Sequence, residues 1–208
     1  MKILNLYAGV GGNRKFWRGD VTAVERDPKI AAVYASLYPD DEVIVGDAHE
    51  YLLANFEDFD FIWTSPPCQS HSRFTRSGRN RTPRYPDMKL YEEILLLQHN
   101  HQGRWVVENV EPYYEPLIPP MRAGRHCIWA NFTIGLVEEP PAFGDFMNST
   151  NMKARQNLMD WLGIHFDDVV YVDGNHCPAQ VLRNCVHPDV GRQIFDAMVH
   201  SHGLFGIE

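Results

Sequence analysis

Strand-like apolar runs and helical segments alternate along the first half of this chain, and no other feature limits the fold as strongly. The apolar runs lie at residues 2–7, 21–24, 43–45, 59–63 and 104–107. Helical spacing of apolar residues occurs between them, at residues 13–17, 29–37, 51–56 and 89–99. Strands that are joined through helices pair in parallel, with helices on both faces of the sheet. The sequence therefore predicts an α/β fold with a mostly parallel, doubly wound sheet.

Size and composition limit the class of protein. The chain has 208 residues, of which 44% are hydrophobic, and this is enough for one globular domain with its own core. No apolar run approaches the roughly 20 residues that a membrane span needs, and the N-terminus has the pattern of a first strand, not of a secretory signal. The four cysteines are too few and too scattered for a disulfide scaffold. We therefore expect a cytoplasmic protein with no membrane partner.

Residues suited to ligand binding follow the ends of successive predicted strands. A glycine-rich turn at residues 8–12 follows the first strand, and Glu25 and Asp47 follow the second and third. Cys68 and Glu108 follow the fourth and fifth strands. Ligands of parallel sheets bind outside the carboxyl ends of the strands, and a glycine turn beside an acidic residue is the arrangement that holds a ribose. The sequence thus predicts a ribose-containing cofactor beside Cys68.

The loop around Cys68 has the composition expected of a nucleophile that acts on a polyanion. Pro66 and Pro67 stiffen the backbone before the cysteine. Residues 69–86 include no acidic residue, and they contain five arginines, Arg73, Arg76, Arg79, Arg81 and Arg84. Nearby cations favour the thiolate form of a cysteine and attract phosphates. The alternatives are a buried structural cysteine and a solvated basic loop, but the convergence of strand ends favours the nucleophile.

The sequence argues against two other kinds of function. The net charge of −8 does not fit a protein that coats nucleic acid. Cysteine and histidine lie close together at residues 126–127, 176–177 and 185–187, but none of these pairs has the spacing of a robust zinc site. We therefore expect no bound metal.

Several motifs, in the right order, resemble those of the DNA cytosine-5 methyltransferases, a branch of the class I S-adenosylmethionine-dependent methyltransferases. Residues 5–12, NLYAGVGG, resemble the first cofactor motif, with Asn5 and Tyr7 in place of the usual Asp and Phe. Residues 65–72, SPPCQSHS, resemble the nucleophile motif, which is highly specific to the family. Residues 108–110, ENV, match the next catalytic motif.

Two later motifs also resemble those of the family, and one of them matches only loosely. Residues 180–188 resemble the last motif of the family, which completes the cofactor pocket. The arginine motif is matched only loosely by residues 122–129, with Arg125 as our candidate and Arg122 or His126 as the alternatives. Small phage-encoded members are most similar in size, which implies a restriction-modification setting in the cytoplasm of a host cell.

The resemblance implies a Rossmann-like methyltransferase fold and a set of roles. The catalytic residues that it implies are Cys68, Glu108, Asn109 and Arg125. The residues implied to bind S-adenosylmethionine are Tyr7, Ala8, Gly9, Gly11, Gly12, Glu25, Arg26, Asp47, Ala48, Pro67, Asn184 and Val186. The residues implied to contact the substrate are Gln69, Ser72, Arg73, Arg76, Arg79 and Arg81. Cys68 would add to carbon-6 of a cytosine flipped out of the duplex, and Glu108 would act at nitrogen-3.

The resemblance also suggests how the chain is divided. Residues 1–131 together with 178–208 correspond to the catalytic domain, and residues 132–177 are left as a short target-recognition or insertion segment. Few side chains of such a short segment can reach base edges, so we expect a target of about two to four base pairs, or help from a partner.

The sequence leaves the substrate open. The implied partner is double-stranded DNA, and a protein partner or a homodimer is allowed. The alternatives are a tRNA cytosine-5 methyltransferase, because the same catalytic residues serve either nucleic acid, and a catalytically silent protein that binds the cofactor and DNA.

Overall fold

A computed structural model of the chain describes residues 1–73, 84–144, 151–172 and 176–202. The strands are β1 (Lys2–Leu6), β2 (Asp20–Glu25), β3 (Glu42–Val45), β4 (Phe61–Thr64), β5 (Arg104–Val110), β6 (Met121–Ala123) and β7 (His126–Ala130). The α-helices are α1 (Pro28–Leu37), α2 (Ala48–Asn55), α3 (Lys89–Asn100), α4 (Met152–Leu162), α5 (Gln180–Arg183) and α6 (Pro188–His202). Short 3-10 helices occur at η1 (Asn13–Phe16), η2 (Phe56–Asp58) and η3 (Cys68–Ser70).

The strands form one 7-stranded sheet in the order β3-β2-β1-β4-β5-β7-β6. Strands β1 to β5 pair in parallel, whereas β7 pairs antiparallel with β5 and with β6. The order reverses between β1 and β4, which is the switch point where ligands of doubly wound sheets bind. The mostly parallel α/β fold expected from the sequence is confirmed, and its architecture is Rossmann-like.

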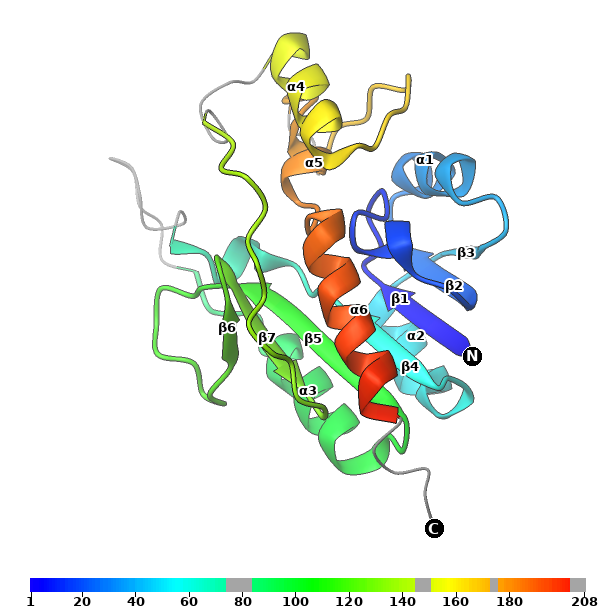
Figure 1. Ribbon diagram of the computed structural model, residues 1–208, viewed down its shortest axis with the longest axis vertical. Coiled ribbons are helices and arrows are strands. Elements are labelled where there is room, and N and C mark those ends of the chain that lie inside the picture. Colours follow the sequence, from blue (N-terminus) through cyan, green and yellow to red (C-terminus); the bar gives the residue numbers. More distant parts are fainter. Residues whose placement is uncertain (74–83, 145–150, 173–175, 203–208) are drawn as a thin grey trace.

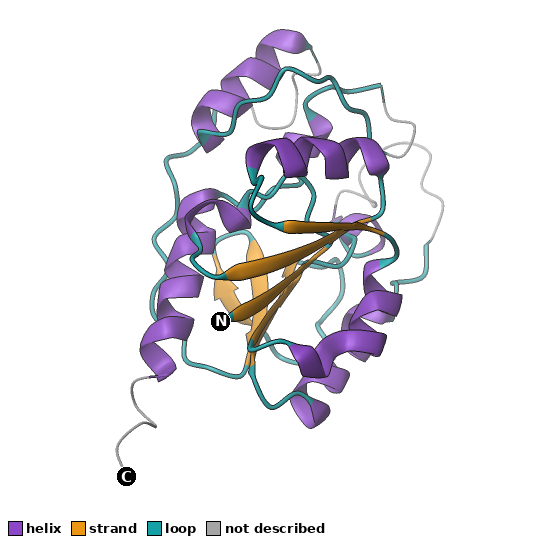
Figure 2. Ribbon diagram, turned by 90° about the vertical axis from the view of Figure 1, so that its right-hand side faces the viewer, coloured by secondary structure: helices purple, strands orange, loops and turns teal. Residues whose placement is uncertain are grey.

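Each face of the sheet carries its own apolar core, because neighbouring residues of a strand point to opposite faces. On one face, Ile3 packs with Trp17, with Phe61 and with α6. On the other face, Leu4 packs with α2 and α3. Figure 1 shows α6 in front of the sheet with α2 and α3 behind it, and Figure 2 shows helices on both sides of the strands. The site at the carboxyl edge of the strands therefore lies on a scaffold that is packed from both sides.

Local sequence signals explain where the first helix begins. Asp27 caps α1, because its Oδ1 accepts hydrogen bonds from the backbone N–H groups of Lys29 at 2.8 Å and Ile30 at 3.3 Å. Pro28 occupies the first position of the helix, where its missing N–H costs no hydrogen bond. This cap directly follows Glu25, the last residue of β2, so the helix start and the acidic strand end are held together.

The second half of the chain contains elements that the sequence analysis did not predict. These are the antiparallel strands β6 and β7 and the helices α4 and α5. In addition, β5 continues to Val110 because β7 pairs with it as far as Val110 and His126. Glu108 and Asn109 therefore lie inside a strand, not after one.

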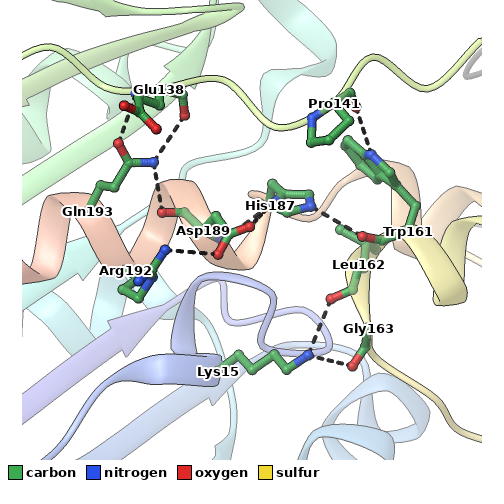
Figure 3. A network of polar contacts seen from close by, with 10 residues as sticks. All are labelled: Lys15, Glu138, Pro141, Trp161, Leu162, Gly163, His187, Asp189, Arg192 and Gln193. Atoms are coloured by element: carbon green, nitrogen blue, oxygen red, sulfur yellow. Dashed lines mark hydrogen bonds and ion pairs between the residues drawn. The ribbon is translucent and has the colours of Figure 1, made fainter.

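The described part of residues 132–177 packs against the rest of the molecule through α4 and neighbouring residues. Ala154 and Leu158 of α4 share an apolar cluster with Val10 and with Val33 of α1. Polar contacts add to this packing, and they are drawn in Figure 3. The division of the chain at residues 131 and 178 stays a prediction.

The contacts of Figure 3 join this segment to α6 and to η1. The Glu138 N–H donates to Gln193 Oε1 at 2.8 Å, and Gln193 Nε2 donates back to the Glu138 carbonyl at 3.0 Å. Trp161 Nε1 donates to the Pro141 carbonyl at 2.8 Å, and Lys15 Nζ donates to the Gly163 carbonyl at 2.6 Å. The Glu138–Gln193 and Lys15–Gly163 contacts fasten the segment to α6 and to η1, whereas the Trp161–Pro141 contact lies within the segment.

Candidate active site

A cavity of about 310 Å³ opens at the carboxyl edge of β1, β2, β4 and β5. It collects most of the site residues that were predicted from the sequence. The predicted residues that line it are Tyr7, Ala8, Gly9, Gly12, Glu25, Arg26, Asp47, Ala48, Pro67, Cys68, Gln69, Glu108, Asn109, Arg125, Asn184 and Val186. These residues come from both ends of the chain, and the fold brings them to one place.

The turn after β1 is tied to the end of β2. Glu25 Oε2 accepts the backbone N–H of Gly9 at 2.9 Å, and Oε1 accepts the N–H of Asp27 at 2.9 Å. Tyr7 and Gly9 both have φ of 55°, a left-handed conformation in which Tyr7 is the one residue with a side chain among those described. A side chain at Gly9 would meet open space, since nothing lies within 4 Å of the position that a Cβ would occupy there. The backbone at Gly9 is therefore open to close approach by a ligand.

Gly11 and Gly12 contribute in different ways. Gly11 lies outside the residues that line the cavity, and a Cβ there would be 2.3 Å from the Tyr38 ring. Its role is packing, because its carbonyl also accepts a hydrogen bond from Tyr38 Oη at 2.7 Å. A Cβ at Gly12 would lie 2.4 Å from the Val186 carbonyl oxygen. Gly12 thus lets the chain before α6 reach the cavity.

Asp47 lines the cavity and also caps α2. Its Oδ1 accepts the backbone N–H groups of His49 at 2.9 Å and Glu50 at 3.1 Å. These hydrogen bonds lower the pKa of Asp47, and the one from the Glu50 N–H has the largest effect. The carboxylate keeps a second oxygen with which to accept a hydrogen bond from a ligand.

Cys68 begins the 3-10 helix η3 and is half-buried beside the cavity. The Cys68 carbonyl accepts the N–H groups of His71 and Ser72 at 3.0 and 2.9 Å. Asn109 Nδ2 donates to the Pro66 carbonyl at 2.9 Å, so β5 holds the backbone ahead of the cysteine. The backbone before Cys68 was predicted to be stiff because of the two prolines, and the Asn109 hydrogen bond holds it in addition.

The pKa of the Cys68 thiol depends on burial and on two nearby charges. Burial raises this pKa and the nearby Glu108 carboxylate raises it further, whereas Arg125 lowers it. The net direction is upward, because desolvation and one negative charge outweigh one positive charge. Among the described residues, Arg125 favours the thiolate as expected of a neighbouring cation, but burial and Glu108 together outweigh it.

Glu108 is buried and has several polar partners. Its Oε1 lies 2.6 Å from Nδ1 of His126, across the β5–β7 ladder. The Ser65 hydroxyl also hydrogen-bonds to it, and Trp63 Nε1 donates to Ser65 Oγ at 2.9 Å. Burial alone would raise the pKa of Glu108, but His126, Ser65 and Arg125 together outweigh burial and lower it.

Arg125 lies in the turn between β6 and β7 and lines the cavity. Its Nε donates to Nε2 of His126 at 3.3 Å, and its Nη2 donates to the Cys185 carbonyl at 3.4 Å. Arg122, the other arginine considered, forms an ion pair with Glu111 and lies outside the residues that line the cavity. The sequence predicted one motif arginine at this place, and in the structure both Arg125 and His126 line the cavity there.

The predicted substrate-contacting residues are only partly brought to the cavity. Gln69 lines it. Ser72 forms an antiparallel bridge with Pro112, and Arg73 Nη2 pairs with Glu111 Oε1 at 2.9 Å. Arg76, Arg79 and Arg81 lie outside the described residues. In the free protein, the beginning of the basic segment is therefore held against the chain after β5.

The match to a family model decides the family. The model of the C-5 cytosine-specific DNA methylases matches residues 1–114, more than half of the chain. The chain belongs to this family. The matched region of this DNA methylase family member includes Cys68 and Glu108, whereas Arg125 and the residues before α6 lie beyond it.

Solved methyltransferase structures show limited similarity to this methylase family member. Spodoptera frugiperda DNMT2 is 24% identical with a TM-score of 0.36, over 52% of this chain and 35% of that chain. S. pombe Dnmt2 is 23% identical with a TM-score of 0.39, over 54% of this chain and 37% of that chain. A TehB-like SAM-dependent methyltransferase from Corynebacterium glutamicum is 19% identical with a TM-score of 0.35, over 52% and 54%.

The present chain thus spans little more than a third of the Dnmt2 chains that it matches. The TM-scores are too low to establish a shared overall structure. No curated protein sequence matches the chain.

Several site residues of this DNA methylase family member were missed by sequence reasoning. His126 was weighed only as a substitute for the arginine, and Ser65 was quoted only as part of a motif. Glu93, which is wholly buried, was not considered. A signal for Glu93 existed, because it lies between Leu90 and Leu97 on the apolar side of a helical pattern, where a carboxylate is costly unless it is paired.

Two findings concern a bound metal ion and a membrane, neither of which was expected from the sequence. Among the residues that the structure describes, no group of three or more His, Cys, Asp and Glu side chains could hold a metal ion. Within those same residues, no helix is both long enough and apolar enough to cross a membrane.

Proposed function

We propose that this chain transfers a methyl group from S-adenosylmethionine to carbon-5 of cytosine in double-stranded DNA, through a covalent adduct with Cys68. One observation carries the proposal. Cys68, Glu108 and Arg125 line the same cavity as the acidic strand ends Glu25 and Asp47. A nucleophile, a carboxylate and a cation thus meet beside a site with the acceptors that a ribose-containing cofactor needs, in a chain of the cytosine methylase family.

The residues at the cofactor end of the cavity fit S-adenosylmethionine. Glu25 already accepts two backbone N–H groups, and its remaining lone pairs can accept ribose hydroxyls. Gly9 has open space where a side chain would be, so the backbone offers no obstacle to the ligand. When bound, the cofactor supplies a methyl group that is activated by a positively charged sulfur.

Cys68 has the role of nucleophile. Carbon-5 of cytosine is weakly nucleophilic, and a thiolate that forms a bond to carbon-6 pushes electron density onto carbon-5. Carbon-5 then accepts the methyl group, a base removes its proton, and the electron pair of the broken C–H bond expels the Cys68 sulfur. Because burial raises the thiol pKa, Cys68 is a thiol in the free protein and loses its proton to solvent water as the substrate binds. The Arg125 charge favours that loss.

Glu108 handles the proton at nitrogen-3 of the base. Addition of sulfur at carbon-6 places negative charge on the ring, and a proton given to nitrogen-3 neutralises it. The lowered pKa of Glu108 means that this carboxyl group is ionised in the free protein at neutral pH. We infer that it takes up a proton when the base enters, because further burial raises a carboxyl pKa.

The substrate base has to leave the duplex, since carbon-6 cannot be reached within the stack. Gln69, Ser72 and Arg73 start the segment that would contact the flipped nucleotide, and Arg76, Arg79 and Arg81 would extend it. Arg73 is paired with Glu111 in the free protein. Contact with a phosphate would therefore exchange one anionic partner for another.

Methyl transfer from labelled S-adenosylmethionine tests the proposal. The purified chain is incubated with mixed-sequence duplex DNA or with tRNA, and a Cys68→Ala variant serves as the control. We expect label in DNA with the wild-type chain and none with C68A. Label in tRNA alone would move the assignment to a tRNA cytosine-5 methyltransferase. Cofactor binding without label in either nucleic acid would indicate the silent alternative.

A further inference from the structure

Glu93 of α3 is a wholly buried carboxylate with three partners at the carboxyl edge of the sheet. Its Oε1 accepts a hydrogen bond from Tyr7 Oη at 2.6 Å and lies 3.0 Å from His49 Nδ1. Its Oε2 accepts a hydrogen bond from Thr64 Oγ1 at 2.6 Å. Both carboxylate oxygens are therefore occupied by groups from other elements.

The three partners come from three elements around the site, here called its walls, although of the three only Tyr7 itself lines the cavity. Tyr7 follows β1, has φ of 55° and lines the cavity. His49 is the second residue of α2, directly after Asp47 and Ala48, which also line the cavity. Thr64 ends β4, four residues before Cys68. A single carboxylate thus connects the turn at the cofactor end, the acidic end of β3 and the loop of the nucleophile.

The charges around Glu93 favour an arrangement that is held firmly. Burial, followed by the charge and hydrogen bond of Glu93, raises the pKa of Tyr7 well above its ordinary value, so the phenol keeps the proton that it donates. The hydrogen bond to Glu93 raises the pKa of His49, which favours an imidazolium beside the carboxylate. A buried carboxylate is costly unless such partners satisfy it. Movement of any one wall would leave it under-satisfied.

We propose that Glu93 is a positioning residue that couples the cofactor end of the cavity to the Cys68 loop. This inference rests on the proposed function for the identity of the cofactor, whereas the coupling itself can be measured on the free protein. A carboxylate that only stabilises the fold would lower the melting temperature when altered. If Glu93 couples two walls, a substitution in one wall changes the property that is measured at the other.

Conservative variants on the two sides of Glu93 test this coupling. Tyr7→Phe removes the hydroxyl at the cofactor end and keeps the ring, and Thr64→Val removes the hydroxyl at the nucleophile loop at nearly constant shape. Tyr51→Phe is the matched control, since Tyr51 also lies partly buried near the sheet but outside the cavity lining. All variants are compared at a temperature well below their melting temperatures.

Two readouts report on the two walls. Titration calorimetry with S-adenosylmethionine reports on the cofactor end. The rate of Cys68 alkylation by iodoacetamide, mapped by mass spectrometry, reports on the nucleophile loop, and the other cysteines are buried. We expect T64V to weaken cofactor binding and Y7F to change the alkylation rate, each by roughly threefold to tenfold, as loss of one hydrogen bond allows. Y51F should change neither.

A double variant closes the test. In the Glu93→Gln background, Tyr7→Phe should add little to the change in alkylation rate, because the group that carries the coupling is already altered. Effects of Y7F confined to cofactor binding and of T64V confined to alkylation would overturn the inference, as would full additivity with E93Q. If the wild-type chain bound no S-adenosylmethionine, the proposed function would fail, and the alkylation rates alone would still decide the coupling.

Discussion

The Nδ1 atom of His126 lies 2.6 Å from Oε1 of Glu108, and both side chains are buried. Arg125 Nε donates to the other ring nitrogen of His126 at 3.3 Å. Nε2 therefore acts as an acceptor, so Nδ1 carries the hydrogen that is donated to Glu108. This places the His126 ring between Arg125 and the Glu108 carboxylate, which also takes part in a hydrogen bond with the Ser65 hydroxyl.

The His126–Glu108 contact should appear in the pH dependence of stability. The folded-state pKa of Glu108 lies below the ordinary value of 4.5. Ionised Glu108 therefore stabilises the folded state above that value, and this stabilisation is lost as pH falls through the folded pKa. His126→Leu removes the hydrogen bond and leaves a buried carboxylate. We expect a loss of roughly 2 kcal/mol in the free energy of unfolding at pH 7.

Chemical denaturation between pH 3 and pH 7 measures this effect. The difference between H126L and the wild-type chain should shrink as pH falls, since protonation of Glu108 removes the charge that His126 satisfies. His126→Asn, whose amide can take the place of Nδ1, is the matched control and should recover part of the loss. A difference that does not vary with pH would show that the contact contributes packing only.

Glu108 and Arg125 should affect the thiol of Cys68 in opposite directions. Glu108 raises the pKa of the thiol and Arg125 lowers it. At pH 7.5, Glu108→Gln should therefore speed alkylation of Cys68, and Arg125→Gln should slow it, each by roughly threefold to tenfold. E108Q should at the same time abolish most methyl transfer. Alkylation that slows in E108Q would contradict the electrostatic account of the site.

Glu25 should determine cofactor affinity. Its carboxylate holds the N–H of Gly9 and faces the cavity. Glu25→Gln turns charge-assisted hydrogen bonds into neutral ones, so we expect the Kd for S-adenosylmethionine to rise by roughly tenfold. Calorimetry measures this change, with the exposed Glu57→Gln as control. An unchanged Kd in E25Q would remove Glu25 from the cofactor site.

The contact between α6 and the segment after β1 should not tolerate a methyl group. A Cβ at Gly191 would lie 2.5 Å from the carbonyl oxygen of Asn13. Alanine normally stabilises a helix interior by about 1 kcal/mol relative to glycine, but overpacking against backbone costs about 1–3 kcal/mol. Gly191→Ala should therefore lower the melting temperature. Gly135→Ala, with open space around its Cβ position, should leave it nearly unchanged.

The sequence was sufficient for the first five strands and for the residues at their ends. The periodicity of these strands is strong, and the fold itself brings their carboxyl ends to one edge, so Glu25, Asp47, Cys68 and Glu108 could be grouped without coordinates. The residues at which the strands end were predicted less accurately than the strands themselves. β5 was predicted to end at Val107 because its extension to Val110 depends on pairing with β7, which is distant in sequence.

Contacts between side chains were beyond the reach of the sequence. The upward shift of the Cys68 pKa depends on how deeply the thiol is buried and how close Glu108 lies. The roles of His126 and Glu93 depend on partners 18 and 86 residues away, respectively. Such pairs become visible only when the sheet order and the placement of α3 are known.

Trapping of Cys68 on 5-fluorocytosine in DNA tests the central claim most directly. Fluorine at carbon-5 cannot be removed as a proton, so the covalent adduct accumulates after methyl transfer. We predict a complex of duplex DNA and protein that forms only with S-adenosylmethionine, maps to Cys68 by mass spectrometry and is absent in C68A. If wild-type protein that binds the cofactor formed no adduct, or formed one at another residue, the account would be contradicted.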